Sequence, residues 1–191
     1  MRSFTLIEIA VVISIILILT AFTLPNFHNA NAKFALDRSI YKLSQDLRIA
    51  EETAMSSETT PPDLFVSDKF PQGGYGLYFQ ENSSSYILFA DCDGDKQYDL
   101  ADHGARAVSC AEAKTNKPYP EKLKEISLES KIKIGTLSPK DAGNSLAVTF
   151  FPPDPTITIY PLPASIASIT LIFGIRTETA SINLNGLIEI Q

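Results

Sequence analysis

The chain has few of the residues that build metal or nucleophilic centres: its 191 residues include two cysteines and two histidines. The cysteines, Cys92 and Cys110, form no Cys-x-x-Cys motif, which excludes a tetrathiolate zinc site. There is no glycine-rich phosphate loop, since Gly73-Gly74-x-Gly76 is typical of a turn that enters a strand. Neither histidine has a nucleophile near it in sequence, and we therefore expect no enzyme activity.

The chain is acidic overall, and its N-terminal segment contains almost no charged residues. The net charge of −6 disfavours direct binding to the backbone of a nucleic acid. From Phe4 to Leu24 the only charged residue is Glu8. A helix of this length reaches about 32 Å, which is enough to cross the hydrocarbon core of a bilayer. A carboxylate placed there costs roughly 3 kcal/mol, so Glu8 is expected to have a cationic partner.

The order of these N-terminal residues is also informative. A short basic leader, Met1-Arg2-Ser3, precedes Phe4-Thr5-Leu6-Ile7-Glu8, an apolar helix and Pro25. This arrangement resembles the N-terminal signature of type IV pilins and type II secretion pseudopilins, with Ser3 where the family usually has Gly. The resemblance implies that a prepilin peptidase cuts between Ser3 and Phe4 and that the amine of Phe4 is methylated. It also implies that Glu8 neutralises the Phe4 amine of a neighbouring subunit in a helical filament.

The resemblance implies a structural subunit, a minor pilin or a pseudopilin. It would cross the cytoplasmic (inner) membrane once, with its C-terminal domain outside, and then enter an extracytoplasmic filament. Its partners would be other subunits, the prepilin peptidase, the inner-membrane assembly platform and membrane lipid. A cleaved secretory signal, a plain signal anchor and a buried core helix are the other interpretations of the segment. The alternative function is a membrane-anchored calcium-binding surface module that does not polymerise.

After Pro25 the pattern predicts an amphipathic helix over residues 26–58. Apolar residues recur in steps of three and four, at Leu36, Ile40, Leu43, Leu47, Ala50 and Ala54. We expect this stripe to pack on the chain's own domain, and a coiled coil with another protein is the alternative. Pro25 is expected to kink or loosen the helix, because it removes a backbone hydrogen bond, and Pro61-Pro62 to end it.

Residues 59–191 form the predicted β-rich extracytoplasmic domain. Strands are expected at 75–79, 86–90, 126–128, 132–134, 146–150, 157–159, 169–175, 181–184 and 187–190, with 101–121 as an irregular excursion. Asn185-Gly186 is a signal for a two-residue hairpin, and prolines around 157–159 predict an edge strand. The expected fold class is α+β: leader 1–3, membrane and assembly helix 4–25, amphipathic helix 26–58, then an antiparallel sheet or small sandwich. This layout resembles the H-type minor pseudopilins.

An acidic loop is the second informative motif. Alternating carboxylates along a tight loop converge on one point, and calcium takes six to eight such oxygen ligands. We expect Asp91, Asp93 and Asp95 as primary ligands, the carbonyl of Gln97 as another, and Asp99 or Asp102 to close a structural calcium site. The spacing resembles an EF-hand loop, but strands are predicted to flank it, and Gly94 follows the second Asp whereas the EF-hand motif has Gly after the third. A solvated acidic turn with Gly94 at its tip is the alternative.

Cys92 lies in this loop, and Cys110 follows in the excursion. In an oxidising compartment the two thiols could form a disulfide that stabilises the fold by roughly 3 kcal/mol. In the alternative, Cys92 is a small core residue at a strand end and Cys110 is independent of it.

Overall fold

The computed structural model describes residues 5–56, 70–92, 94–98, 121–153 and 156–191, without the side chains of residues 22–30. This part of the chain contains one helix, α1 (Leu6–Met55), and nine strands. The chain divides into two compact units, residues 1–35 and 36–191. The predicted α+β class is confirmed, because the strands form antiparallel sheets and the second unit also contains the C-terminal part of the helix.

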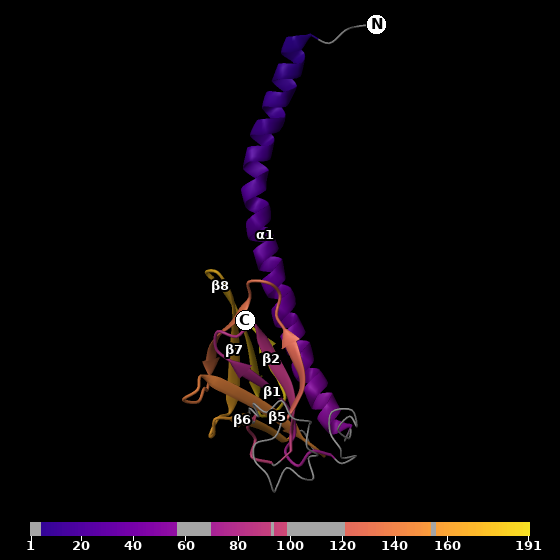
Figure 1. Cartoon of the computed structure of the whole chain (residues 1–191), viewed down its shortest axis with the longest axis vertical. Helices are drawn as coiled ribbons and strands as arrows, with labels where there is room; N and C mark the ends of the chain where they lie inside the picture. Colours follow the sequence, from indigo (N-terminus) through magenta and orange to yellow (C-terminus); the bar gives the residue numbers. More distant parts are fainter. Residues whose placement is uncertain (1–4, 57–69, 93, 99–120, 154–155) are drawn as a thin grey trace, which may run out of the picture. The chain divides into compact units, whose positions relative to one another are not determined.

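The nine strands form two antiparallel sheets (Figure 1). In chain order they are β1 (Gly74–Gln80), β2 (Ser85–Asp91), β3 (Lys122–Ser127), β4 (Lys133–Ser138), β5 (Ser145–Phe151), β6 (Thr156–Tyr160), β7 (Ile166–Phe173), β8 (Arg176–Asn183) and β9 (Ile188–Ile190). The first sheet has the order β3-β2-β1-β5-β6 and the second has the order β4-β7-β8-β9. The turn after β1 joins the two sheets: Asn82 N donates to Ile134 O, and Ile134 N donates to Ser83 O, both at 2.8 Å.

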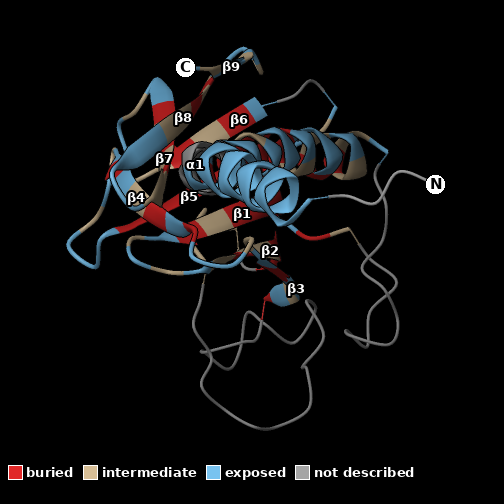
Figure 2. Ribbon diagram, turned by 90° about the horizontal axis from the view of Figure 1, so that it is seen from above, coloured by how far each residue is buried: buried red, intermediate tan, exposed pale blue. Residues whose placement is uncertain are grey.

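The part of α1 that belongs to the second unit packs on the chain's own strands, as predicted. The apolar stripe Leu36, Ile40, Leu43, Leu47, Ala50 and Ala54 is at most 2% exposed. Figure 2 shows other buried residues on β1, β5 and β7 beside the helix. The helix lies beside both sheets: the Tyr86 hydroxyl of β2 donates to Asp46 Oδ2, and Arg48 of the helix and Ile190 of β9 line one small pocket. The apolar face of this part of the helix is therefore covered by strands of the same unit.

The bounds of α1 differ from the expected ones at the C-terminal end. The backbone continues as helix through Pro25, and the helix ends at Met55, before the predicted residue 58. In the last turn Ser56 N donates to Glu52 O, and the Ser56 hydroxyl donates to Thr53 O. Local hydrogen bonds of this kind satisfy carbonyls that have no helical partner. Pro61-Pro62, the expected terminator, lies outside the described residues.

Two of the predicted strand features are confirmed. β6, the strand framed by prolines, lies at an edge of its sheet. Gly73 and Gly74 form the turn into β1: a Cβ on Gly73 would lie 1.7 Å from Asp91 Oδ2, and Gly74 has φ +91°. Side chains do not fit at the first position and are strained at the second, so the turn requires glycine there.

The predicted two-residue hairpin at Asn185-Gly186 is wrong in its length. Ile182 pairs with Ile188, and Gly186 N donates to Asn183 O across a longer loop. The Asn183 side-chain oxygen accepts hydrogen bonds from the N–H groups of Asn185 and Leu187, so it stabilises the wider turn. The two-residue hairpin is instead at Gly174-Ile175, between Phe173 of β7 and Arg176 of β8. Gly174 has φ +62°, as a type II′ turn requires at its first central residue.

Candidate functional site

The start of α1 carries a reciprocal set of hydrogen bonds between Thr5 and Glu8. Glu8 Oε2 accepts from the backbone N–H and from the hydroxyl of Thr5, both at 2.9 Å. Glu8 N in turn donates to Thr5 Oγ1 at 3.4 Å. This is the capping box in which a threonine precedes the helix and a glutamate lies three residues later. Glu8 therefore orders the first turn of its own helix, a role that the sequence analysis missed although Thr5-x-x-Glu8 is its signal.

The turns that follow are apolar on every side. Large apolar side chains between Leu6 and Leu19 are between 52% and 87% exposed, and they include the consecutive residues Val11, Val12 and Ile13. A stripe on one face would leave polar residues between them, whereas a helix that is apolar all round is typical of one surrounded by other apolar groups. The first unit supplies no such surroundings among its described residues.

The membrane span expected at Phe4–Leu24 falls partly on Phe4 and on the side chains of residues 22–24, which the structure does not describe. Judged on the described residues alone, the chain has no helix with the length and apolar character needed to cross a membrane. The processing residues Ser3 and Phe4 lie outside the described residues, and Pro25 is described only as helical backbone.

Asp91, the first residue of the acidic loop, points inward. It is fully buried at the end of β2, and its two oxygens accept hydrogen bonds from Gly94 N at 2.7 Å and Lys96 N at 3.0 Å. The Lys96 ammonium lies 3.8 Å from Asp91 Oδ2 and donates to Gly73 O at 2.9 Å. Asp91 thus holds the loop to the start of β1, and Lys96 supplies a cation beside it.

Burial dominates the electrostatics of this carboxylate. Loss of solvent raises the pKa of Asp91 to about 6, although hydrogen bonds from Gly94 and the charge of Lys96 act in the opposite direction. A buried carboxyl favours its neutral form unless a cation or enough donors compensate. The contacts of Lys96 therefore offset only part of the penalty for burying a negative charge.

The calcium site stays a prediction. Asp95 and Gln97 are described, and the Asp95 carboxylate accepts a hydrogen bond from Gln97 N at 2.9 Å. The other expected ligands, Asp93, Asp99 and Asp102, lie outside the described residues. Within the described part of the chain no three acidic, histidine or cysteine side chains are grouped to hold a metal ion. The partners of the Asp91 carboxylate among the described residues are the backbone N–H groups of Gly94 and Lys96 and the Lys96 ammonium.

Only one of the two cysteines of the predicted disulfide lies within the described residues. Cys92 is 1% exposed, follows β2 directly and is not a free thiol. Its expected partner, Cys110, lies outside the described residues, so this pairing stays a prediction. The Cys92 N–H donates to Glu121 Oε1 at 2.8 Å, and Glu121 is fully buried just before β3. The burial of Glu121 was not predicted, because nothing in the neighbouring sequence distinguishes it from a surface glutamate.

Comparison with protein-family models, curated proteins and solved structures found no match. The described residues form a capped, apolar and exposed helix in one unit and a loop anchored by a buried carboxylate in the other. The first arrangement is suited to association with apolar surroundings and the second to holding a surface loop in place.

Proposed function

We propose that this chain is a structural subunit of a type IV pilus-like or type II secretion filament, a minor pilin or pseudopilin that assembles through its N-terminal helix. Before assembly the chain is anchored in the cytoplasmic membrane by the segment from Phe4 to Leu24, with residues 59–191 outside. A prepilin peptidase removes Met1–Ser3 and exposes the amine of Phe4. The N-terminal resemblance motivates this proposal, and the helix-first, antiparallel-sheet layout agrees with it.

The observation that carries the proposal is the apolar surface between Leu6 and Leu19, which is exposed on all sides of α1. Contiguous apolar surface of this extent marks an interaction site with protein or membrane. Lipid covers it while the subunit waits, and the helices of neighbouring subunits cover it in the filament. The same environment makes an uncompensated charge at Glu8 unfavourable, so assembly favours a stagger that gives Glu8 a cation.

The capping geometry leaves Glu8 able to take that partner. Both hydrogen bonds from Thr5 reach Oε2, and no hydrogen bond to Oε1 is found among the described residues. A carboxylate has lone pairs on both oxygens, so one oxygen can order the helix start while the other accepts a proton donor from another chain. The amine of a neighbouring Phe4 is a donor of the right charge for Oε1.

The first test is the mass of the N-terminal peptide of protein isolated from its native host. The proposal expects a peptide that begins at Phe4 and carries a methyl group. A peptide that begins at Met1 would instead support a membrane-anchored surface module that does not polymerise.

The second test separates the charge of Glu8 from its capping role. Glu8→Gln keeps a side-chain oxygen that can accept from Thr5, since glutamine also serves in a capping box, but it removes the negative charge. We expect Glu8→Gln and Glu8→Leu to abolish incorporation into filaments. The matched variant Thr5→Val removes the capping hydroxyl, keeps the charge and is expected to assemble. Normal incorporation of Glu8→Gln would contradict the charge-pairing mechanism.

A further inference from the structure

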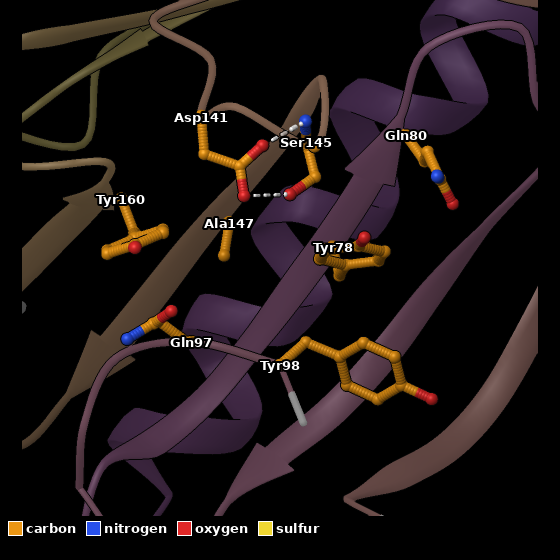
Figure 3. Close-up of a pocket in the computed structure, with 9 residues that line it drawn as sticks. Tyr78, Gln80, Gln97, Tyr98, Asp141, Ser145, Ala147 and Tyr160 are labelled. Carbon is orange, nitrogen blue, oxygen red and sulfur yellow. Dashed lines mark hydrogen bonds between the residues drawn. The ribbon is translucent and has the colours of Figure 1, made fainter. Parts of the chain in front are cut away.

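A hollow on the first sheet has the shape and chemistry of a small binding site (Figure 3). Its volume is about 290 Å³, just below the roughly 300–1,000 Å³ of small-molecule sites, so the hollow suits a small ligand. Figure 3 shows Ala147 between Tyr160 and Tyr78, with Gln97 reaching in from the loop that follows β2. Nothing in the proposed filament function uses this hollow.

Strand register creates the hollow. Ala147 of β5 pairs with Tyr78 of β1 on one side and with Tyr160 of β6 on the other. A methyl group therefore forms the floor between two tyrosines, which start from backbone positions two strand spacings apart, or about 10 Å. Side chains stand roughly perpendicular to a sheet, so the two rings form opposite walls. A single six-membered ring between them can contact both.

One wall is fixed by other aromatic rings. Tyr98 packs against Tyr78 with ring centroids 4.8 Å apart and meets Phe89 edge-on at 5.5 Å. Burial raises the pKa of Tyr98 to about 12, so its phenol stays neutral at physiological pH. A wall that is ordered before the ligand arrives reduces the entropy that binding must overcome.

The polar groups of the hollow suit hydroxyl groups. The Asp141 carboxylate accepts hydrogen bonds from Ser145 N at 2.7 Å and Ser145 Oγ at 2.9 Å, which fix its orientation. Each carboxylate oxygen keeps a second acceptor site, and the amides of Gln80 and Gln97 both donate and accept. No lysine or arginine is among the described residues that line the hollow, so an anionic ligand would find no opposite charge there.

We propose that this hollow binds a neutral saccharide, with one sugar ring inserted between Tyr78 and Tyr160 over Ala147. The C–H groups of a sugar ring meet the negative faces of the tyrosines, and its hydroxyls meet the amides, Ser145 and Asp141. A quaternary ammonium group would also be attracted to the tyrosine faces and to the Asp141 carboxylate, but it has no donor or acceptor for the amides of Gln80 and Gln97.

The test uses the full-length chain in a polyoxyethylene detergent, which contains neither sugar nor choline. Saturation-transfer difference NMR is recorded with the methyl glycosides of glucose, galactose, mannose and N-acetylglucosamine and with choline. Binding of inorganic phosphate, which has no carbon-bound protons, is followed by the width of its phosphorus-31 signal. At least one glycoside is expected to bind. Binding of choline or phosphate without any glycoside, or of no probe at all, overturns the proposal.

Substitutions in the hollow test whether the glycoside binds there. Ala147→Leu fills the floor and is expected to abolish the glycoside signal, and Tyr160→Ala is expected to weaken binding about tenfold or more. Tyr160→Phe keeps the ring and should bind nearly as well as the wild type. Thr158→Ala is the matched control, because Thr158 lies two residues before Tyr160 on the same face of β6 but outside the hollow. If Tyr160→Ala is folded by circular dichroism and binds like the wild type, the saccharide does not bind here and the proposal fails.

Discussion

The two parts of α1 use apolar residues in different ways. Between Leu6 and Leu19 apolar side chains point in all directions and stay exposed, whereas from Leu36 to Ala54 they form one stripe that the strands cover. The first pattern needs apolar surroundings from outside the chain, and the second is satisfied within its own unit. Periodicity along one continuous helix thus distinguishes a surface for assembly from a surface for folding.

The largest expected effect distinguishes these two surfaces directly. Leu43 is fully buried in the stripe, and Leu43→Ala should lower the free energy of unfolding of the second unit by about 4 kcal/mol, because it leaves a cavity. Leu17, which is 64% exposed, is the matched residue, and Leu17→Ala should leave that free energy unchanged. Denaturant unfolding of the full-length chain, followed by tyrosine circular dichroism, measures both. Equal losses would show that the two surfaces are not distinct.

The next effect depends on pH and on the buried carboxylate of Asp91. Its pKa in the folded chain, about 6, is above the ordinary value of 3.8, because burial disfavours the charged form. The folded state therefore binds the proton more tightly, and the stability that this gives is fully present below pH 4 and is lost as the pH rises through 6. The full contribution is about 3 kcal/mol, and about 2 kcal/mol of it is lost between pH 4 and pH 7 relative to Asp91→Asn. Parallel pH dependence of the two proteins would contradict this.

Adding calcium to the same unfolding measurement tests whether the acidic loop binds this ion. The unfolding experiments with Asp91 are first made in EGTA and then in millimolar calcium. If the acidic loop binds the ion as predicted, calcium favours the charged carboxylate and should remove the loss of stability at pH 7. If calcium leaves the unfolding curve unchanged at both pH values, the loop is an acidic turn that Asp91 and Lys96 hold in place.

A smaller effect is expected at the contact between the helix and β2. The hydroxyl of Tyr86, a residue that is 1% exposed, donates to Asp46 Oδ2. Asp46→Ala leaves this buried donor without its acceptor and should lower the free energy of unfolding by about 2 kcal/mol. Tyr86→Phe removes the hydroxyl donor itself, so no buried donor is left unpaired. It should lower the free energy of unfolding by about half as much. Chemical denaturation of the two variants and of the double mutant gives the coupling between the residues, and additive losses would argue against the hydrogen bond.

The smallest effect is a gain. Ser39 lies in α1 at 4% exposure, and its hydroxyl has no hydrogen-bond partner among the described residues. Ser39→Ala should therefore raise the free energy of unfolding by about 1 kcal/mol, since it removes an unsatisfied polar group and alanine favours the helix. In the first unit the Ser14 hydroxyl is exposed and donates to Ala10 O, so Ser14→Ala should leave the stability of the second unit unchanged. A loss of stability in Ser39→Ala would mean that the hydroxyl does find a partner.

Local periodicity was enough to predict much of the fold. The stripe from Leu36 to Ala54 and the alternation of Ile157 and Ile159 in β6 each have one buried face, which leaves a repeating pattern in the sequence. Turn lengths were harder to predict, because the side chain of Asn183 widened a loop whose Asn-Gly pair favoured a shorter one.

The sites were less predictable than the elements. The inward position of Asp91 and the burial of Glu121 depend on tertiary packing at the ends of β2 and β3, which residue spacing does not determine. The hollow over Ala147 depends on strand register between distant segments, and no local motif marks it. The cap formed by Thr5 and Glu8 was within reach of sequence reasoning, but the pilin-like explanation of Glu8 already accounted for that residue.

That cap has a mechanical consequence for the proposed assembly. Because Thr5 and Glu8 close the first turn on themselves, the N-terminal end of the rod does not depend on the leader for its order. In the proposed assembly, the first turn of a subunit that leaves the bilayer would thus stay helical. The next subunit would then contact an ordered helix end instead of a frayed one.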